Sequence, residues 1–351
     1  MNFRAAVLAE LNQPLVLDEL TVPDLRFGQV LVKIRCTGIC GAQINEIDGA
    51  KGPDAFLPHL LGHEATAEVL EVGEGVTTVK PGDTVVCHWR KGTGIHAPTP
   101  TYESATFGKV NSGWVTTFSE LSVVSENRVT PIPADFDPEA GALFGCAVTT
   151  AMGVLNNDAR LGIGQSVAIF GSGGVGLSLI QFAAMIAANP IVAIDLMPDK
   201  LELARTLGAT HTIDARGADL VEAIRAIVGP LGVDVAIETT GNPDVIEAAY
   251  EATSAQGRVV LVGVPSKAQR KPSFYTLPLH FDKVLTGSEG GGSRPDVDIP
   301  KLVRLVEAGT LSLDGIVARR YRFEQINDAI ADLRSGSVPG RCLVWMEDPP
   351  A

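Results

Sequence analysis

The stretch from residue 167 to residue 195 constrains the fold of this chain more than any other segment. An apolar run, Val167 to Phe170, enters the glycine-rich sequence GSGGVG; a helical segment follows, and then a second apolar run, Ile191 to Ile194. Another helix is expected from about Pro198, and the later segments DVAIETTG and RVVLVGVP are predicted to be two more buried strands. Apolar strands that alternate with helices predict an α/β fold with a parallel sheet that is covered by helices on both faces.

Gly171, Gly173 and Gly176 spell G-x-G-x-x-G between the first strand and the helix. Glycines at these positions let the backbone approach a pyrophosphate, whose charge is stabilised by the amino end of the helix. Asp195, nineteen residues beyond Gly176, stands where a carboxylate would accept hydrogen bonds from the adenosine ribose of a dinucleotide. That carboxylate would repel a 2′-phosphate and no arginine directly follows it, so the motif favours NAD over NADP. The alternative is a glycine turn in a sheet that binds no nucleotide.

The remaining sequence predicts a second, β-rich domain. A chain of 351 residues is too long for one ordinary core. Up to about residue 130 it consists of short β-type runs broken by glycine, such as QVLVKIRCTGIC and DTVVCHWR. After the α/β segment come two amphipathic helices, in IPKLVRLVEAGTL and FEQINDAIADLRSG, and a closing strand, RCLVWM. This tail does not continue the strand–helix alternation, and we expect it to pack back onto the first domain.

Charge and composition exclude several kinds of partner. A net charge of −13 would repel a phosphate backbone, which argues against nucleic acid. The N-terminus has no long apolar run after a basic start, and no stretch reaches the length of a membrane span. We therefore expect no signal peptide, no membrane partner and a cytoplasmic location. The five cysteines are odd in number and widely spread, which does not suit a disulfide framework.

Three residues are candidate metal ligands: Cys40 in GICGAQINE, His63 in GHE and Cys146 in FGCAVTT. Taken singly, each cysteine is more often a small buried residue, and the histidine is more often structural. Ala42 and Gln43, just beyond Cys40, carry neither a hydroxyl nor a carboxylate. The metal interpretation therefore depends on the combination of these residues with the sequence around them.

In that combination the chain resembles the zinc-dependent medium-chain alcohol dehydrogenases. The segments that carry the resemblance occur in the family's order and spacing: GICG, GHEATAEVLEVGEGVTTVKPGD, GCAVTTAMGV, GSGGVG, ETTG, LVGVP and the tail DIPKL, INDAI and LRSG. The resemblance implies a Rossmann domain with a doubly wound parallel sheet at residues 149–282. It also implies a GroES-like β-rich catalytic domain formed by residues 1–148 and 283–351. A homodimer or homotetramer is expected, as is usual in the family.

The resemblance also assigns roles to individual residues. Cys40, His63 and Cys146 match the three protein ligands of one catalytic zinc ion, Glu64 matches an acid beside it that is a transient or outer ligand, and Thr150 matches a threonine that faces the nicotinamide. Two thiolates and one imidazole leave a fourth position open, as Lewis-acid catalysis requires. The residues expected to bind NAD are Gly171, Gly173, Gly174, Val175, Gly176, Asp195, Lys200, Val264 and Arg341.

Two departures from the family pattern affect the expected chemistry. The segment at residues 88–113 contains no cysteine, so we expect no structural zinc; the segment is then either a loop held by packing of aromatic residues or a lid over the pocket. Ala42 replaces a hydroxyl residue that starts the proton relay, and Gln43 replaces an acid, so the zinc is expected to be a stronger Lewis acid. The proton must then leave through water, a substrate hydroxyl, or a side chain such as His59 or Glu46.

The predicted function is hydride transfer between an alcohol and NAD⁺, giving an aldehyde or ketone, or the reverse. The substrate is a small molecule, and the hydrophilic segment at residues 88–113 together with Arg90 favours a polar or secondary-metabolite alcohol. The resemblance adds a thiol–aldehyde adduct as a candidate, because some members of the family act on such adducts. Trp89 and Arg90 are expected to border the pocket with Ala42, and Arg90 is either a ligand for a substrate carboxylate or phosphate or a solvated surface residue. Two alternatives remain: a lyase or epimerase that oxidises its substrate transiently, and a non-catalytic NAD-binding protein.

Overall fold

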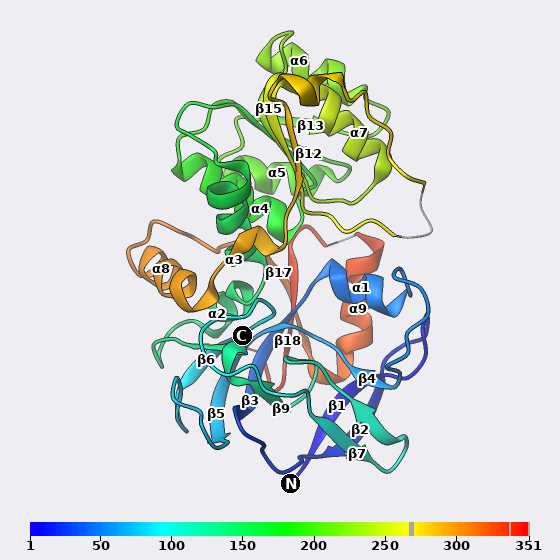
Figure 1. The fold of residues 1–351 in the computed structure, drawn as a ribbon, viewed down its shortest axis with the longest axis vertical. Helices are drawn as coiled ribbons and strands as arrows, with labels where there is room; N and C mark the ends of the chain where they lie inside the picture. Colours follow the sequence, from blue (N-terminus) through cyan, green and yellow to red (C-terminus); the bar gives the residue numbers. More distant parts are fainter. Residues whose placement is uncertain (267–269, 337, 350–351) are drawn as a thin grey trace. The chain divides into compact units, whose positions relative to one another are not determined.

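The computed structural model describes residues 1–266, 270–336 and 338–349. The chain divides into two compact units. The first unit consists of Met1–Cys146 and Arg294–Ala351, so it contains both ends of the chain, blue and red in Figure 1. The second unit consists of Ala147–Ser293, mostly green and yellow in the same figure.

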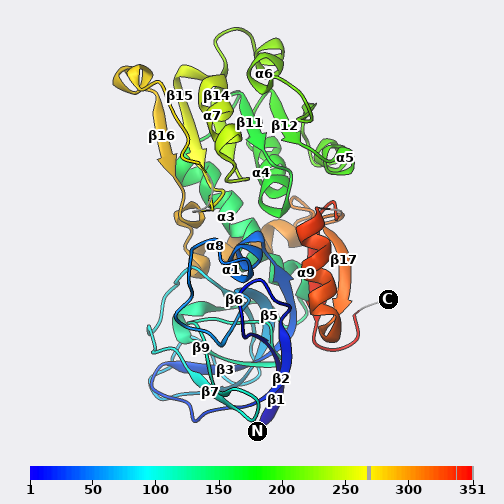
Figure 2. The ribbon, with the colours of Figure 1, turned by 90° about the vertical axis from the view of Figure 1, so that its right-hand side faces the viewer.

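The second unit is built around a six-stranded parallel sheet with the order β13-β12-β11-β14-β15-β16. From β11 the chain builds the sheet outward in both directions, which is the doubly wound arrangement. Figure 2 shows β16 at one edge of this sheet. The strands are β11 (Val167–Phe170), β12 (Ile191–Asp195), β13 (His211–Asp214), β14 (Val233–Glu238), β15 (Thr253–Leu261) and β16 (Val284–Gly287).

The described residues of the second unit also form five helices, of which the last four connect successive strands of the sheet. They are α3 (Ala147–Gly153), α4 (Gly174–Met185), α5 (Pro198–Thr206), α6 (Leu220–Val228) and α7 (Pro243–Ala252), with a π-helical turn at Val154–Ala159 and 3-10 turns at Leu277–Phe281 and Gly290–Gly292. All four residues of β11 are buried, and one apolar core joins strands β11, β12, β14 and β15 to helices α6 and α7. The predicted strands at Val167–Phe170 and Ile191–Ile194 and the helix from Pro198 are confirmed.

The first unit contains a closed barrel and a seven-stranded sheet. The barrel has the order β1-β2-β7-β8-β4, and the sheet has the order β10-β6-β5-β3-β18-β17, with β9 also paired to β3. The barrel strands are β1 (Asn2–Leu8), β2 (Val16–Thr21), β4 (His59–Leu60), β7 (Thr101–Ser104) and β8 (Gly108–Asn111). The sheet strands are β3 (Gln29–Ile39), β5 (Glu64–Val72), β6 (Thr84–His88), β9 (Leu121–Ser125), β10 (Val129–Pro131), β17 (Val317–Arg322) and β18 (Arg341–Trp345).

The C-terminal tail completes this sheet. Strand β18 lies between the N-terminal strand β3, to which it is antiparallel, and β17, to which it is parallel. The prediction that the tail packs back onto the first domain is therefore confirmed. The helices of this unit are α1 (Gly41–Ile47), α2 (Pro138–Phe144), α8 (Pro295–Glu307) and α9 (Ile326–Ser335), with 3-10 turns at Glu126–Arg128 and Phe323–Gln325.

The end of the second unit differs from the boundary expected at residue 282. Strand β16 pairs with β15 from Arg258↔Val284 to Leu261↔Gly287, so residues 284–287 belong to the parallel sheet. The compact unit continues to Ser293, and it begins at Ala147 rather than at residue 149. The four residues VLTG are too few to show the strand–helix alternation by themselves, so their sequence does not reveal that they belong to the parallel sheet.

The segment at residues 88–113 contains a hairpin of the barrel. Strands β7 and β8 pair with each other, β7 also pairs with β2, and β8 pairs with β4. Tyr102 is buried, and its hydroxyl accepts a 2.8 Å hydrogen bond from the Val123 N–H, whereas Trp114, just beyond the segment, is 45 % exposed. Pairing with the barrel, rather than aromatic packing alone, therefore holds this segment, and a lid formed by residues 101–111 does not agree with this pairing.

No single helix among the described residues has the length and apolar composition to cross a membrane. The segments Pro138–Phe144 and Ala147–Ala159 meet those criteria only when they are taken together as a bent pair. All residues of α2 except Pro138 and all of α3 except Met152 are buried, as in the core helices of globular domains.

Candidate metal centre and cofactor loop

Cys40, His63 and Cys146 form a compact group of possible metal ligands in the first unit. One ligand atom from each residue lies within 4.8 Å of the others, and no other group of this kind occurs among the described residues. Sulfur and nitrogen atoms bound tetrahedrally to zinc at about 2.0–2.3 Å lie roughly 3.3–3.8 Å apart. Small side-chain adjustments would therefore allow the three residues to share one ion.

The pairing of strands explains how these distant residues meet. Strands β3 and β5 are antiparallel, with Thr37 opposite Ala65, so Cys40, just after β3, and His63, just before β5, lie at the same end of the pair. Cys146 follows α2 and Gly145. A Cβ atom at Gly145 would lie 2.4 Å from the Cys87 carbonyl oxygen and 2.7 Å from the Glu64 Cα, so only glycine lets this backbone pass so close to β5.

The electrostatics of the group suit a cation. The Nε2 atom of His63 is buried without a hydrogen-bond partner, although buried polar atoms usually have one. A hydrogen bond with Cys146 is the main cause that holds the pKa of the Cys40 thiol well below its usual range, while burial acts against it. By contrast, burial raises the pKa of Cys87 to about 12. Thiolates and a free imidazole nitrogen are the donors that zinc prefers, so the residues fit a zinc ion.

Glu64 lies outside the three-residue group, although its neighbour His63 belongs to it. Its carboxylate forms an ion pair with the guanidinium of Arg341 on β18, and both residues are almost completely buried, at 0 % and 4 % exposure. A Cβ atom at Gly38 would lie 2.4 Å from a Glu64 carboxylate oxygen, so this glycine leaves the room that the carboxylate occupies. In the structure, therefore, the residue expected beside the metal and the residue expected at the pyrophosphate are paired with each other.

The Gln43 side chain contacts two members of the group, Cys40 and His63. It is 1 % exposed on α1, its Oε1 accepts a 3.0 Å hydrogen bond from the Cys40 N–H, and its Nε2 lies within hydrogen-bond distance of His63 Nδ1. Cys40 is also the N-cap residue of α1, with Gln43 at the third helical position, as in a capping box. Sequence reasoning identified Gln43 as a lost acid but missed this cap, which the three-residue spacing from Cys40 could have indicated.

A cavity of about 540 Å³ adjoins His63 and Gln43 in the first unit. Its lining combines charged and polar residues, which include Glu46, Lys51, Asp54 and His59, with apolar ones such as Phe56, Leu60, Leu61 and Val115. The Asp54 carboxylate lies 2.9 Å from His59 Nε2, and the Lys51 ammonium lies 3.3 Å from a Glu46 oxygen. The cavity therefore presents charged groups of both signs beside a candidate metal ligand.

Ala42, Trp89 and Arg90 do not line this cavity. Ala42 is half-buried on α1. Trp89 and Arg90 directly follow β6. His88, the last residue of β6, pairs with Glu64, the first residue of β5, so Trp89 and Arg90 continue beyond the end of β5 that His63 precedes. The Arg90 guanidinium carbon lies 5.6 Å from the Trp89 ring centroid, which is a cation–π distance.

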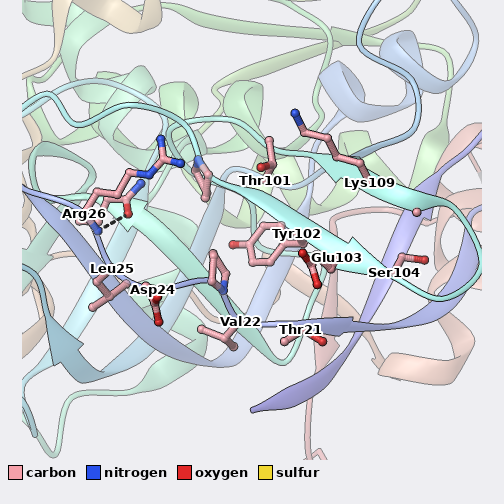
Figure 3. A pocket seen from close by; sticks show the side chains of 14 residues that line it. Thr21, Val22, Asp24, Leu25, Arg26, Thr101, Tyr102, Glu103, Ser104 and Lys109 are labelled. Carbon is pink, nitrogen blue, oxygen red and sulfur yellow. Dashed lines mark hydrogen bonds between the residues drawn. The ribbon is translucent and has the colours of Figure 1, made fainter.

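A second, larger cavity of about 810 Å³ lies on the barrel, at β2 and β7 (Figure 3). Its labelled side chains include Asp24, Arg26, Tyr102, Glu103 and Lys109. None of the residues that the sequence analysis singled out as catalytic or cofactor-binding lines it. Size alone therefore does not identify the functional site of this chain.

The glycine loop of the second unit has the geometry of a phosphate cradle. Gly171 has φ +95°, and a Cβ atom at Gly176 would lie 1.9 Å from the Gly171 carbonyl oxygen, so both positions require glycine. Gly173 is the N-cap of α4 and provides no side-chain cap, and nothing lies within 4 Å of its Cβ position. The first turn of α4, with Gly174 and Val175, therefore offers uncapped N–H groups beside open space.

Asp195 ends β12 next to this loop. Its carboxylate accepts hydrogen bonds from the Ser172 N–H at 2.7 Å and from the Met197 N–H at 3.0 Å. Lys200 lies in the first turn of α5, and Val264, which follows β15, is 57 % exposed. The Thr150 hydroxyl on α3 is buried and has no hydrogen-bond partner in the described structure. All four residues belong to the second unit with the glycine loop.

Comparison with known proteins agrees with this geometry. Residues 26–134 match the alcohol dehydrogenase GroES-like domain, and residues 174–308 match the zinc-binding dehydrogenase family. S-(hydroxymethyl)glutathione dehydrogenase of Escherichia coli is 33 % identical over 362 aligned positions, covering 96 % of this chain and 98 % of the relative. The chain belongs to the zinc-dependent alcohol dehydrogenases of the medium-chain dehydrogenase/reductase superfamily.

Solved structures extend the likeness to the whole chain. The crystal structure of an alcohol dehydrogenase zinc-binding domain protein from Burkholderia ambifaria has a TM-score of 0.90 at 28 % identity, covering 99 % of this chain and 100 % of that one. Benzyl alcohol dehydrogenase from Acinetobacter calcoaceticus has a TM-score of 0.88 at 27 % identity, with the same coverage. The predicted fold class is confirmed, and so is the function as an enzyme that interconverts an alcohol and a carbonyl compound with NAD(H).

Proposed function

We propose that Cys40, His63 and Cys146 hold one zinc ion and that the chain oxidises a polar alcohol with NAD⁺, or reduces the carbonyl product. The observation that carries this proposal is the group of three ligand atoms within 4.8 Å, with a buried, unpartnered His63 Nε2 among them. A bound zinc ion supplies Lewis acidity toward the substrate oxygen through its open fourth position. No structural zinc is proposed, because barrel pairing holds the cysteine-free segment at residues 88–113.

The residues of the second unit would orient the cofactor. The uncapped first turn of α4 would bind the pyrophosphate through backbone N–H groups of Gly173, Gly174, Val175 and Gly176. Asp195 would accept hydrogen bonds from the ribose hydroxyls. Lys200, in the first turn of α5, would contact the same ribose. Thr150 and the Val264 backbone would position the nicotinamide, and Arg341 would bind the pyrophosphate in addition to Glu64.

Substitution of Asp195 by asparagine should shift the cofactor preference. The variant keeps the shape of the side chain but loses the charge, so NAD affinity should fall on the order of 10- to 100-fold while discrimination against NADP weakens. Isothermal titration calorimetry with each nucleotide measures both dissociation constants. Asp214→Asn is a matched control, since Asp214 lies opposite Asp195 in the register of β12 and β13 and is expected to bind no nucleotide. An unchanged ratio of the two affinities in Asp195→Asn would remove Asp195 from the cofactor site.

The charged residues that line the cavity support a substrate with polar groups. Glu46, Lys51 and the Asp54–His59 pair would interact with hydroxyl, amino or carboxylate groups better than with an apolar alcohol. The relatives named for S-(hydroxymethyl)glutathione make a thiol–aldehyde adduct one candidate of this class. Arg90 would extend the same preference to an anionic group on the substrate.

The cavity also provides a path for the proton of the alcohol. Ala42 has no hydroxyl with which to begin a relay, whereas His59 and Glu46 line the same cavity as His63. His59 is held by the Asp54 carboxylate, so its ring has a fixed orientation. We favour His59, with water between it and the substrate, as the group that passes the proton to solvent.

A panel of alcohols and carbonyl compounds, followed by NADH absorbance, tests the proposed function. Polyols, thiol–aldehyde adducts and acidic alcohols should give turnover that depends on zinc and exceeds that of apolar alcohols of similar size. Turnover of substrate without net change in NADH would favour the lyase or epimerase alternative. Binding of NAD with neither zinc nor turnover would favour a non-catalytic NAD-binding protein.

We also propose that the chain forms a homo-oligomer through the edge of the parallel sheet. Among the described residues β16 pairs with β15 alone, and the segment before it exposes Tyr275 at 72 %, Leu277 at 48 % and Phe281 at 64 %. An open edge beside apolar side chains suits a second copy of the same chain.

We further propose a cytoplasmic location. None of the five cysteines forms a disulfide bond, and the two proposed thiolate ligands are best preserved in a reducing compartment.

A further inference from the structure

The Gln43 side chain lies between the Cys40 N–H and His63 Nδ1, and the hydrogen bond that His63 requires changes when a metal binds. In the structure its Oε1 lies 3.0 Å from the Cys40 backbone nitrogen, and its Nε2 faces His63 Nδ1. A backbone N–H can only donate, so the amide atom next to Cys40 must be the oxygen. The amide nitrogen then faces His63, and it can only donate. In this orientation His63 Nδ1 is an acceptor, and its ring proton must reside on Nε2.

A metal-bound His63 needs the opposite arrangement. The unpartnered Nε2 is the nitrogen available to the group of cysteines, and it binds a cation through its lone pair. The single proton of a neutral imidazole must then reside on Nδ1, which becomes a donor and requires an acceptor. Gln43 can provide one only by turning its amide so that Oε1 faces His63. The NH₂ group would then face the Cys40 N–H, one donor against another.

We propose that Gln43 is a positioning residue that cannot satisfy both neighbours once zinc is bound. Loading the site turns the amide, frees the Cys40 N–H at the N-cap of α1, and thereby lowers the affinity for the metal. Gln43 is 1 % exposed, so little of its amide reaches the adjoining cavity, from which any replacement hydrogen bond would have to come. A carboxylate at this position would accept from the Cys40 N–H and from His63 Nδ1–H at the same time. The inference rests on the proposed role of His63 as a ligand.

The test compares zinc affinity in Gln43→Glu with that in the unmodified protein, by competition with a chromophoric chelator. Partners in the outer shell of a metal site typically change its affinity by 10- to 100-fold, so Gln43→Glu should bind zinc about 10- to 100-fold more tightly. Asn45→Asp is the matched control, since it adds the same charge to α1 beside the same cavity without contacting His63. Its zinc affinity should change less than about threefold. Equal tightening in both variants, or none in Gln43→Glu, would overturn the inference.

A second measurement uses the unmodified protein and does not depend on the folding of a variant. The amide hydrogen of Cys40 should exchange faster with solvent deuterium after zinc loading, because its hydrogen bond to Gln43 is lost. Exchange that is equal or slower with zinc would contradict the proposal.

If zinc binds equally well when Cys146 is replaced by serine, the proposed ligand set itself fails. If that substitution removes zinc while Gln43→Glu changes nothing, only the role of Gln43 fails.

Discussion

The Cys146→Ser protein should lose its zinc and, with it, about 1,000-fold or more of its alcohol-oxidising activity, while it still binds NAD. A serine hydroxyl is neutral near pH 7 and is a poor replacement for a thiolate ligand. Lewis-acid stabilisation by the metal amounts to several kcal/mol of the barrier, and each 1.36 kcal/mol is a factor of ten in rate. The glycine loop and Asp195 belong to the second unit and do not depend on this sulfur. Metal analysis, steady-state rates and NAD titration measure the three properties.

Cys36→Ser provides the control for this experiment. Cys36 is fully buried on β3, and its Sγ lies 3.2 Å from the Pro138 carbonyl oxygen, a bond that a serine hydroxyl can also donate. It lies outside the three-residue group, so this variant should keep both zinc and turnover. Full activity in Cys146→Ser, or equal loss in both variants, would contradict the assignment of Cys146 as a ligand.

The Arg341→Met protein should be destabilised by about 3–5 kcal/mol. Removing one partner of a buried ion pair leaves the other charge without compensation, and such changes are among the most destabilising single substitutions. Glu64 would remain at 0 % exposure with no cation beside it. All three tryptophans of the chain, Trp89, Trp114 and Trp345, belong to the first unit, so the urea dependence of tryptophan fluorescence reports the unfolding of that unit. The measurement is made with a chelator present, so that changes in metal binding do not contribute.

A double-mutant cycle separates the ion pair from other effects. Glu64→Gln alone removes the carboxylate charge, and the double variant Glu64→Gln/Arg341→Met removes both charges. The double variant should be more stable than the sum of the two single losses predicts, by about 2 kcal/mol or more. Additive losses would show that the two side chains do not interact in solution.

The second unit could be predicted from local sequence because its pattern is continuous. Strand, glycine loop, helix, strand and acid follow one another within residues 167–195, and each is recognisable by its own residues. Two of its glycines are fixed by contacts that no other residue tolerates, at Gly171 and Gly176. The metal ligands were harder to predict, since Cys40, His63 and Cys146 are far apart in sequence. Only the resemblance to a family joined them before the β3–β5 pairing was known.

Other features depend on pairings between distant segments, and the sequence pattern alone does not specify these. The ion pair between Glu64 and Arg341 requires that β18 enter the sheet beside β3, more than three hundred residues away in sequence. Whether the cysteine-free segment was a loop or a lid could not be decided, because β7 and β8 are short and pair with β2 and β4 from other parts of the chain. The two roles of Gln43 arise from a capping position and a ligand contact that meet only in the folded protein.

X-ray absorption at the zinc edge of the purified, metal-loaded protein tests the central claim most directly. If two cysteines and one histidine hold the ion, the spectrum should show two sulfur neighbours at about 2.3 Å and nitrogen or oxygen neighbours at about 2.0–2.1 Å, four ligands in all. A spectrum without sulfur neighbours, or with four of them, would contradict the ligand set of Cys40, His63 and Cys146.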